Sequence, residues 1–305
     1  MKKFWSLTSV LYLFLIGTNV FAMSSTNYWI PWDTVNSGGS DVGSSTNYSI
    51  RDSIGGTVVG TSTSANYHLS QGYRVPEEAN TLSYIVKAIG STTSTYSAFT
   101  NGAGGTVTVG SASGFSAGDL IAVVENEGFG QLVAVGIISS IAGTTITVDQ
   151  FEGDGGSMSA SPSGGDDFVY LLDVNSFNFG TVSASTEHTA VVGTSVLTNV
   201  STGYSVYVQA NQELQNASAQ VMAEVTDGTV STGSEEYGAE VTGATAFGAG
   251  TDLGVTTTQR VIQTSASASG TTSDKVAMIF KLAITGSTNA GDYTQTVYYT
   301  LTANY

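Results

Sequence analysis

The chain has 305 residues, with 8 Lys and Arg against 24 Asp and Glu, and a formal net charge of -16 at pH 7. An excess of acidic groups repels phosphate backbones, so we expect no nucleic acid as a partner. Hydrophobic residues make up 41% and charged residues 10% of the chain, which excludes a disordered acidic tail and a membrane protein. The length allows two or three compact units.

Residues 1–22 have the parts of a secretory signal peptide. Lys2 and Lys3 precede an apolar run over residues 10–16, and small residues at Val20 and Ala22 fit a cleavage site. The alternative is a retained membrane anchor, but the run is shorter than the roughly 20 apolar residues that a span needs. We therefore predict cleavage after Ala22 and a secreted or cell-surface protein with no membrane span in its mature form.

Cysteine is absent from the sequence. An exported chain without cysteine folds without disulfides, and it has no N-terminal cysteine to carry a lipid.

Residues 23–80 contain a repeated pattern. Three segments each carry Asn-Tyr, followed after one residue by Ile or Leu; they are Ser24–Ile30, Ser44–Ile50 and Thr63–Leu69. We interpret each copy as a polar turn that leads into a short strand, and Pro76–Asn80 as a linker. The pattern resembles a module of exported bacterial surface proteins, and that resemblance implies a location more than an activity.

Residues 81–173 hold short β-branched runs that are separated by glycine turns. These runs cover residues 106–109, 120–124, 132–138, 145–148 and 168–172. Five short strands in this length predict a small β-barrel or sandwich module.

Residues 174–305 alternate between apolar and polar side chains. The alternation is clear in residues 275–285, and in residues 293–305 it places Tyr299 and Leu301 on one face and Thr300 on the other. A period of two with one apolar face predicts half-buried antiparallel strands, here in a C-terminal β-sandwich. Because no segment sustains a helical period, the predicted fold class is all-β, built from several antiparallel modules with very little helix beyond the signal peptide.

The C-terminal part also resembles secreted β-sandwich domains of bacterial surface and fimbria-like proteins. The residues that carry this resemblance are Phe177–Gly180, Gly203–Val206, Glu236–Gly238 and Ala290–Thr294. The resemblance implies a structural or adhesive role.

Groups that support catalysis are few. The chain has two histidines, His68 and His188, with no thiol and no Gly-x-Ser-x-Gly elbow. The adjacent acid pairs at residues 166–167 and 235–236 leave a secreted glycosidase as a distant hypothesis, because sugar hydrolysis runs on two carboxyl groups. We predict that the protein is not an enzyme.

Asp149, Glu152 and Asp154 place three carboxylates on one glycine-rich loop. Calcium binds clustered oxygen ligands, so this loop is a candidate calcium site, and no other cofactor is expected. The alternative is a solvated acidic loop that keeps the surface soluble.

Tyr28, Trp29 and Trp32 form an aromatic group near the expected mature N-terminus. Such side chains stack on sugar rings or insert into the groove of a neighbouring subunit, and local packing of the first repeat is the third interpretation.

These patterns together predict a secreted, non-enzymatic structural or adhesive protein at the cell surface or outside the cell. Its expected partners are other surface proteins or further copies of itself, as in a filament or surface layer. The alternative is a carbohydrate-binding protein that uses the N-terminal aromatic residues to bind glycans.

Overall fold

The computed structural model describes residues 80–304 and, before them, six short strands in the N-terminal part of the chain. The chain divides into two compact units, residues 1–79 and residues 80–305. The all-β prediction is confirmed: regular structure in the described residues consists of antiparallel strands and one turn of 3-10 helix, η1 (Asp154–Gly156). Among these residues, no helix has the length and apolar character needed to cross a membrane.

The described part of the first unit contains three antiparallel strand pairs, and each pair overlaps one of the Ser/Asn/Tyr repeats. The pairs are β1 (Ser24–Ser25) with β2 (Tyr28–Trp29), β3 (Gly43–Ser44) with β4 (Ser49–Ile50), and β5 (Gly60–Thr63) with β6 (His68–Gln71). The predicted signal peptide and residues 76–79 of the predicted linker Pro76–Asn80 lie outside the described residues.

In the second unit, six strands form a closed ring with the order β13-β9-β10-β11-β8-β7, because β13 pairs back onto β7. Two-residue β12 pairs with β10 outside the ring. The strands are β7 (Leu82–Thr100), β8 (Thr106–Val109), β9 (Leu120–Glu125), β10 (Leu132–Ala142), β11 (Thr145–Val148), β12 (Glu152–Gly153) and β13 (Phe168–Val174).

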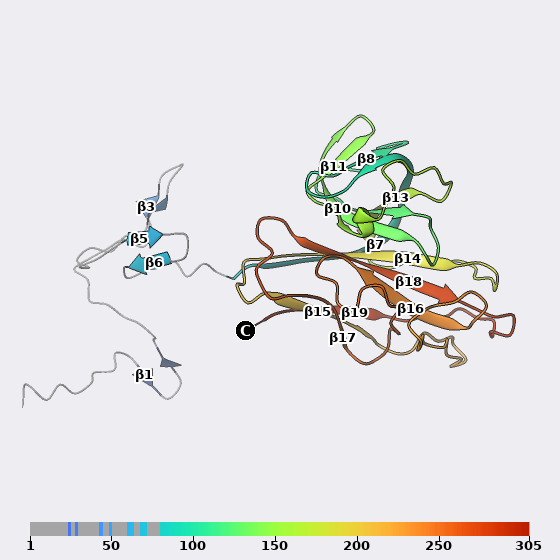
Figure 1. Ribbon diagram of the computed structural model, residues 1–305. Coiled ribbons are helices and arrows are strands. Elements are labelled where there is room, and N and C mark those ends of the chain that lie inside the picture. The colour runs from blue at the N-terminus through green and yellow to red at the C-terminus, as the bar shows by residue number, and fades with distance from the viewer. Residues whose placement is uncertain are drawn as a thin grey trace, which may run out of the picture. The chain divides into compact units, whose positions relative to one another are not determined.

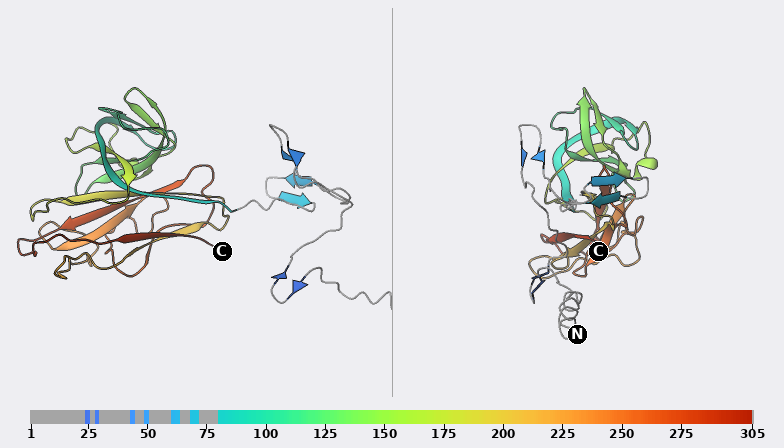
Figure 2. Two further views of the ribbon diagram at one scale, coloured as in Figure 1. Left: turned by 180° about the vertical axis from the view of Figure 1, so that it is seen from behind. Right: turned by 90° about the vertical axis from the view of Figure 1, so that its left-hand side faces the viewer.

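Below the ring lies a two-sheet sandwich (Figure 1). The first half of β7 continues into the middle sheet, whose order is β7-β14-β18-β16, and the outer sheet has the order β17-β15-β19. The additional strands are β14 (His188–Thr198), β15 (Tyr204–Ala210), β16 (Glu236–Thr242), β17 (Arg260–Ser265), β18 (Asp274–Ala283) and β19 (Val297–Ala303). The second unit therefore has three layers, which Figure 2 shows from behind and from the side.

Apolar cores lie inside the ring and between each pair of neighbouring layers. One core fills the ring, a second fills the space between the two sheets, and a third joins the ring to the middle sheet. In the third core, Leu120 and Val135 of the ring pack near Val191 of β14 and Ile279 of β18. Strands β14 and β18 are consequently buried on both faces, and an alternating apolar and polar pattern is lost there.

The sequence predicts one apolar face for residues 275–285, and that face is confirmed in the sandwich core, where Val276, Met278 and Phe280 lie. The opposite face is also buried, because the ring covers it. The expected boundary between residues 173 and 174 falls inside β13, and β7 belongs to both sides of it. The ring and the sandwich are parts of one compact unit.

Gly193 allows the ring to approach β14. A Cβ atom at this position would lie 2.5 Å from Leu172 Cδ1, 3.2 Å from Leu120 Cδ2 and 3.3 Å from Val135 Cγ1, all of which belong to the ring. We expect Gly193→Val to destabilise the second unit by about 1–3 kcal/mol through overpacking, measured as a lower midpoint in urea unfolding. Gly165→Val, at a glycine with open space around it, is the control and should leave the midpoint unchanged. Equal midpoints for the two variants would contradict this packing.

Candidate functional site

A cleft of about 1050 Å³ opens between the two sheets of the sandwich. Its floor is apolar and includes Phe280 and Leu282 of β18 and Tyr237 of β16. The cleft follows from the path of β7, which pairs with β14 only as far as Ala88 and then pairs with β13 of the ring. The first residues of β14 therefore lack a neighbour from β7, and the sandwich is open at this edge.

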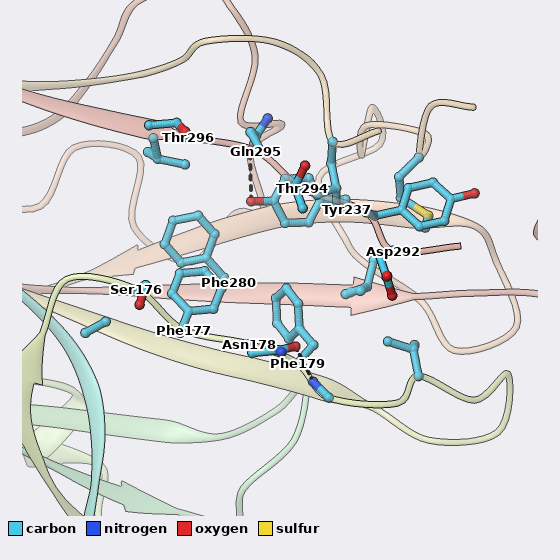
Figure 3. A pocket seen from close by; sticks show the side chains of 18 of the residues that line it. Ser176, Phe177, Asn178, Phe179, Tyr237, Phe280, Asp292, Thr294, Gln295 and Thr296 are labelled. Carbon is cyan, nitrogen blue, oxygen red and sulfur yellow. Dashed lines mark hydrogen bonds between the residues drawn. The ribbon is translucent and has the colours of Figure 1, made fainter. Parts of the chain in front are cut away.

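The segment after β13 lies along this opening without joining a sheet. Its two aromatic residues enter the cleft: the Phe177 ring centroid lies 4.9 Å from that of Phe280 and 5.3 Å from that of Phe179 (Figure 3). Between them, the Asn178 side chain accepts a 2.8 Å hydrogen bond from the Gly180 N–H. The sequence showed this Phe-x-Phe alternation, but not that the segment forms a wall rather than a strand.

Polar groups at the cleft are paired with one another. The Tyr237 hydroxyl donates to Gln295 Oε1 at 3.0 Å (Figure 3). Gln295 Nε2 donates to the carbonyls of Gln212 and Val255 at 2.8 and 2.9 Å. Burial raises the pKa of Tyr237, so its hydroxyl stays neutral. The floor of the cleft is apolar, and polar side chains such as Asn175, Asp292 and Thr294 also line it.

Strand β19 borders the cleft. Its predicted faces are confirmed, because Val297, Tyr299 and Leu301 pack against the sandwich core while Tyr298 is 55% exposed. The inward residues are only half-buried, although their equivalents on β15 are buried. On one side β19 pairs with β15, and no strand in the described part of the chain pairs with its other edge.

The acidic loop that was a candidate calcium site joins the ring to the sandwich instead. Asp149 lies 2.8 Å from the ammonium of Lys275, a fully buried lysine on β18. Glu152 accepts a 3.0 Å hydrogen bond from the Lys275 backbone N–H. Asp154 accepts hydrogen bonds from the Thr242 hydroxyl at 2.6 Å and from the Val133 N–H at 3.0 Å.

The geometry therefore does not support the predicted calcium site. Among the described residues, no three acidic or histidine side chains lie close enough together to hold a metal ion. Burial raises the pKa of Glu152, and the Lys275 N–H and ammonium oppose this effect. Instead, the three carboxylates accept hydrogen bonds or pair with a cation from the facing layer. A loop that was only solvated would not make these contacts.

The other acidic pairs and His188 also bind neighbouring backbone or hydroxyl groups. Asp167 accepts hydrogen bonds from the Asn126 and Gly164 N–H groups. Glu236 accepts from the Ser231 N–H, and Glu235 accepts from the Thr288 hydroxyl. His188 Nε2 lies 3.2 Å from the Ser183 nitrogen, as acceptor of its N–H. The structure does not bring these acidic pairs together.

The aromatic candidates belong to the first unit. Tyr28 and Trp29 form β2, whose side chains are not described, and Trp32 lies outside the described residues. The second histidine, His68, begins β6.

Glu224 lies beside the segment that lines the cleft. Both of its carboxylate oxygens are buried, two residues after Met222, which lines the cleft. Burial raises the pKa of Glu224 to about 8, and the nearby Glu213 carboxyl adds to the rise, while the Val255 N–H and Arg260 lower it. The side chain therefore keeps its proton at neutral pH.

Comparison of the chain with protein-family models, curated protein sequences and solved structures found no match.

Substitution of Asp154 tests whether the acidic loop stabilises the fold. We expect Asp154→Ala to destabilise the fold by about 1–3 kcal/mol, because it leaves the N–H of fully buried Val133 without an acceptor. Thermal unfolding measures the loss, and Asp166→Ala, at an exposed position, is the control. A chelator should leave the melting temperature of the wild type unchanged. A melting temperature that falls when chelator is added would show that the loop binds calcium after all.

The raised pKa of Glu224 predicts that the stability of the fold depends on pH. Its carboxyl releases its proton near the ordinary value of 4.5 in the unfolded chain and near 8 in the folded one. Between these values the folded state binds more protons, so its stability falls as pH rises from about 5 to 8. We expect Glu224→Gln to reduce this fall in melting temperature. A wild type and variant with parallel pH profiles would contradict the assignment.

Proposed function

We propose that this protein is an exported, non-enzymatic structural or adhesive subunit, and that it associates with further copies through the sandwich cleft. In this proposal, an extended segment of a second chain pairs with the free edge of β19 and places alternate side chains in the cleft. The observation that carries the proposal is that the unpaired edge of β19 borders a cleft with an apolar floor. Addition of a strand to an exposed sheet edge is a general mode of peptide recognition.

The hydrogen bonds of β19 show which backbone groups are available. Just before the strand, the Thr296 carbonyl accepts a hydrogen bond from the Asn211 N–H, and just after it the Asn304 N–H donates to the Gly203 carbonyl. The backbone N–H and C=O groups of the even-numbered residues therefore point toward β15. In an antiparallel strand the direction of these groups alternates. Val297, Leu301 and the other odd-numbered residues therefore direct their N–H and C=O groups toward the free edge.

The edge also lacks the features by which proteins protect free strands. Monomeric proteins place lysine, proline, a bulge or an inward-pointing charge on such an edge. Residues 297–303 contain no charged residue and no proline, and the pairing of β19 with β15 has no bulge. A strand of this composition favours pairing with another chain.

Export and adhesion are the parts of the proposal that come from the sequence. The predicted signal peptide supports a role outside the cell. The apolar floor of the cleft and the unpaired edge of β19 support a protein partner, because an added strand bonds to backbone groups at the edge and places apolar side chains in the cleft.

The test removes edge donors while keeping the fold. Val297→Pro with Ala303→Pro should abolish concentration-dependent association, because each proline removes one N–H from the free edge and none from the β15 pairing. Thr300→Lys, on the outward face of the same strand, should leave association intact. Sedimentation velocity of the mature chain measures association, and circular dichroism checks the fold.

A wild-type protein that stays monomeric over the whole concentration range would overturn the proposal. Binding of that monomer to a glycan array would favour the carbohydrate-binding alternative.

A further inference from the structure

A second site, separate from the cleft, contains a buried lysine between two carboxylates. Lys281 of β18 has a side chain that is 6% exposed, and its amine lies 2.7 Å from Glu240 Oε2 and 2.9 Å from Asp252 Oδ1. Glu240 belongs to β16, the strand beside β18, and Asp252 belongs to the loop between β16 and β17. The Asp252 side chain is 4% exposed and that of Glu240 is 24% exposed.

The two oxygens of Asp252 have different surroundings. Oδ2 accepts a 2.7 Å hydrogen bond from the Val230 N–H, whereas Oδ1 has no aligned hydrogen-bond donor although the lysine amine is close to it. Val230 packs with Val225 and Ala283 in a small apolar cluster, so this part of the molecule is dry. The lysine nitrogen thus lies beside Oδ1 of the Asp252 carboxyl group, with a backbone donor on the other oxygen.

We propose that Lys281 and Asp252 join in an intramolecular amide bond, which the fold itself promotes and in which Glu240 carries a proton. In this bond, Lys281 Nζ attacks Asp252 Cγ, and the bond between Cγ and Oδ1 breaks. The ammonium and the carboxylate together lose one water molecule, whose oxygen is Oδ1 and whose two hydrogens come from the nitrogen. The reaction is a condensation and needs no oxidant, reductant or cofactor.

Each group in the site has a place in this reaction. Burial lowers the pKa of the Lys281 amine, but Glu240 and Asp252 raise it overall, so the amine starts as an ammonium. Transfer of one proton to Asp252 gives a neutral amine and a neutral acid, a pair that a dry site tolerates better than separated charges. Glu240 Oε2 then accepts the second proton as the new bond forms and delivers it to the departing oxygen.

The geometry supplies the remaining assistance. Negative charge develops on Oδ2 during the attack, and the Val230 N–H already donates to that atom. The fixed contact of 2.9 Å replaces an encounter between two free molecules, and well-oriented intramolecular reactions reach effective concentrations of roughly 10⁵ M or more.

Lys275 provides an internal comparison in the same strand. Its amine lies 2.8 Å from Asp149 Oδ2, but its other contact is the Ser273 carbonyl, which is not a base. The Asp149 side chain is 29% exposed and accepts two backbone N–H groups through Oδ1. Water and these donors stabilise the Asp149 carboxylate, so we expect no bond at Lys275.

The proposed bond would join central strand β18 to the loop that precedes β17 of the outer sheet. It would give a chain without cysteine a covalent link between β18 and the segment that pairs with β16 at Ala239 and Leu253. This role does not depend on the cleft or on self-association.

Intact mass spectrometry of the mature chain tests the proposal. We expect a mass lower by one water molecule than the sequence mass for the observed N-terminus, in nearly all molecules. Lys281→Arg and Glu240→Gln should each restore the full calculated mass, whereas Lys275→Arg should keep the loss of water. Trypsin should fail to cleave after Lys281, and fragmentation should show a branched peptide that contains residues 252 and 281.

A full sequence mass in the folded wild type would overturn the proposal. A loss of water that persists in Lys281→Arg would also overturn it, because it would come from dehydration of an aspartate elsewhere. If a variant does not fold, the peptide map of the wild type still decides, since it either contains the branched peptide or contains residues 252 and 281 in separate linear peptides.

Discussion

The structure of the second unit depends on the burial of one sheet between two layers. Strands β14 and β18 face the outer sheet on one side and the ring on the other, so nearly every side chain in them is removed from water. Burial on this scale supplies most of the favourable free energy of folding, but it leaves no solvent for a charged group. The two lysines of β18 can stay only because carboxylates reach them from the ring and from β16 and its following loop.

Periodicity predicted the strands but not their neighbours. The all-β class and the inward face of β19 followed from alternation over residues 293–305, because one side of that strand meets water. The same reasoning described β18 as half-buried, since a pattern in one strand contains no information about a layer from a distant part of the chain. The span of β7 was not predicted either, as its Ser- and Thr-rich second half resembles a loop in composition.

The candidate sites show the same limit in chemical terms. Three carboxylates on one loop resemble a cation site, and the cation that they meet is partly Lys275, a residue more than a hundred positions away. The useful signal was in β18 itself: two lysines six residues apart, with only apolar residues between them, must each have an acidic partner if that strand is central. The cleft had no such signal, because it results from where β7 leaves the sandwich.

The path of β7 also sets the order in which the second unit can form. Ala88 pairs with Val192 of β14, and the whole ring lies between them in the sequence. Direct closure of so long a loop carries a large entropic cost. Once the ring has closed, however, Ala88 is already paired with Val174, which is close in sequence to β14. The ring is therefore a folding template for the sandwich, and because it precedes β14 in the chain, synthesis on the ribosome delivers it first.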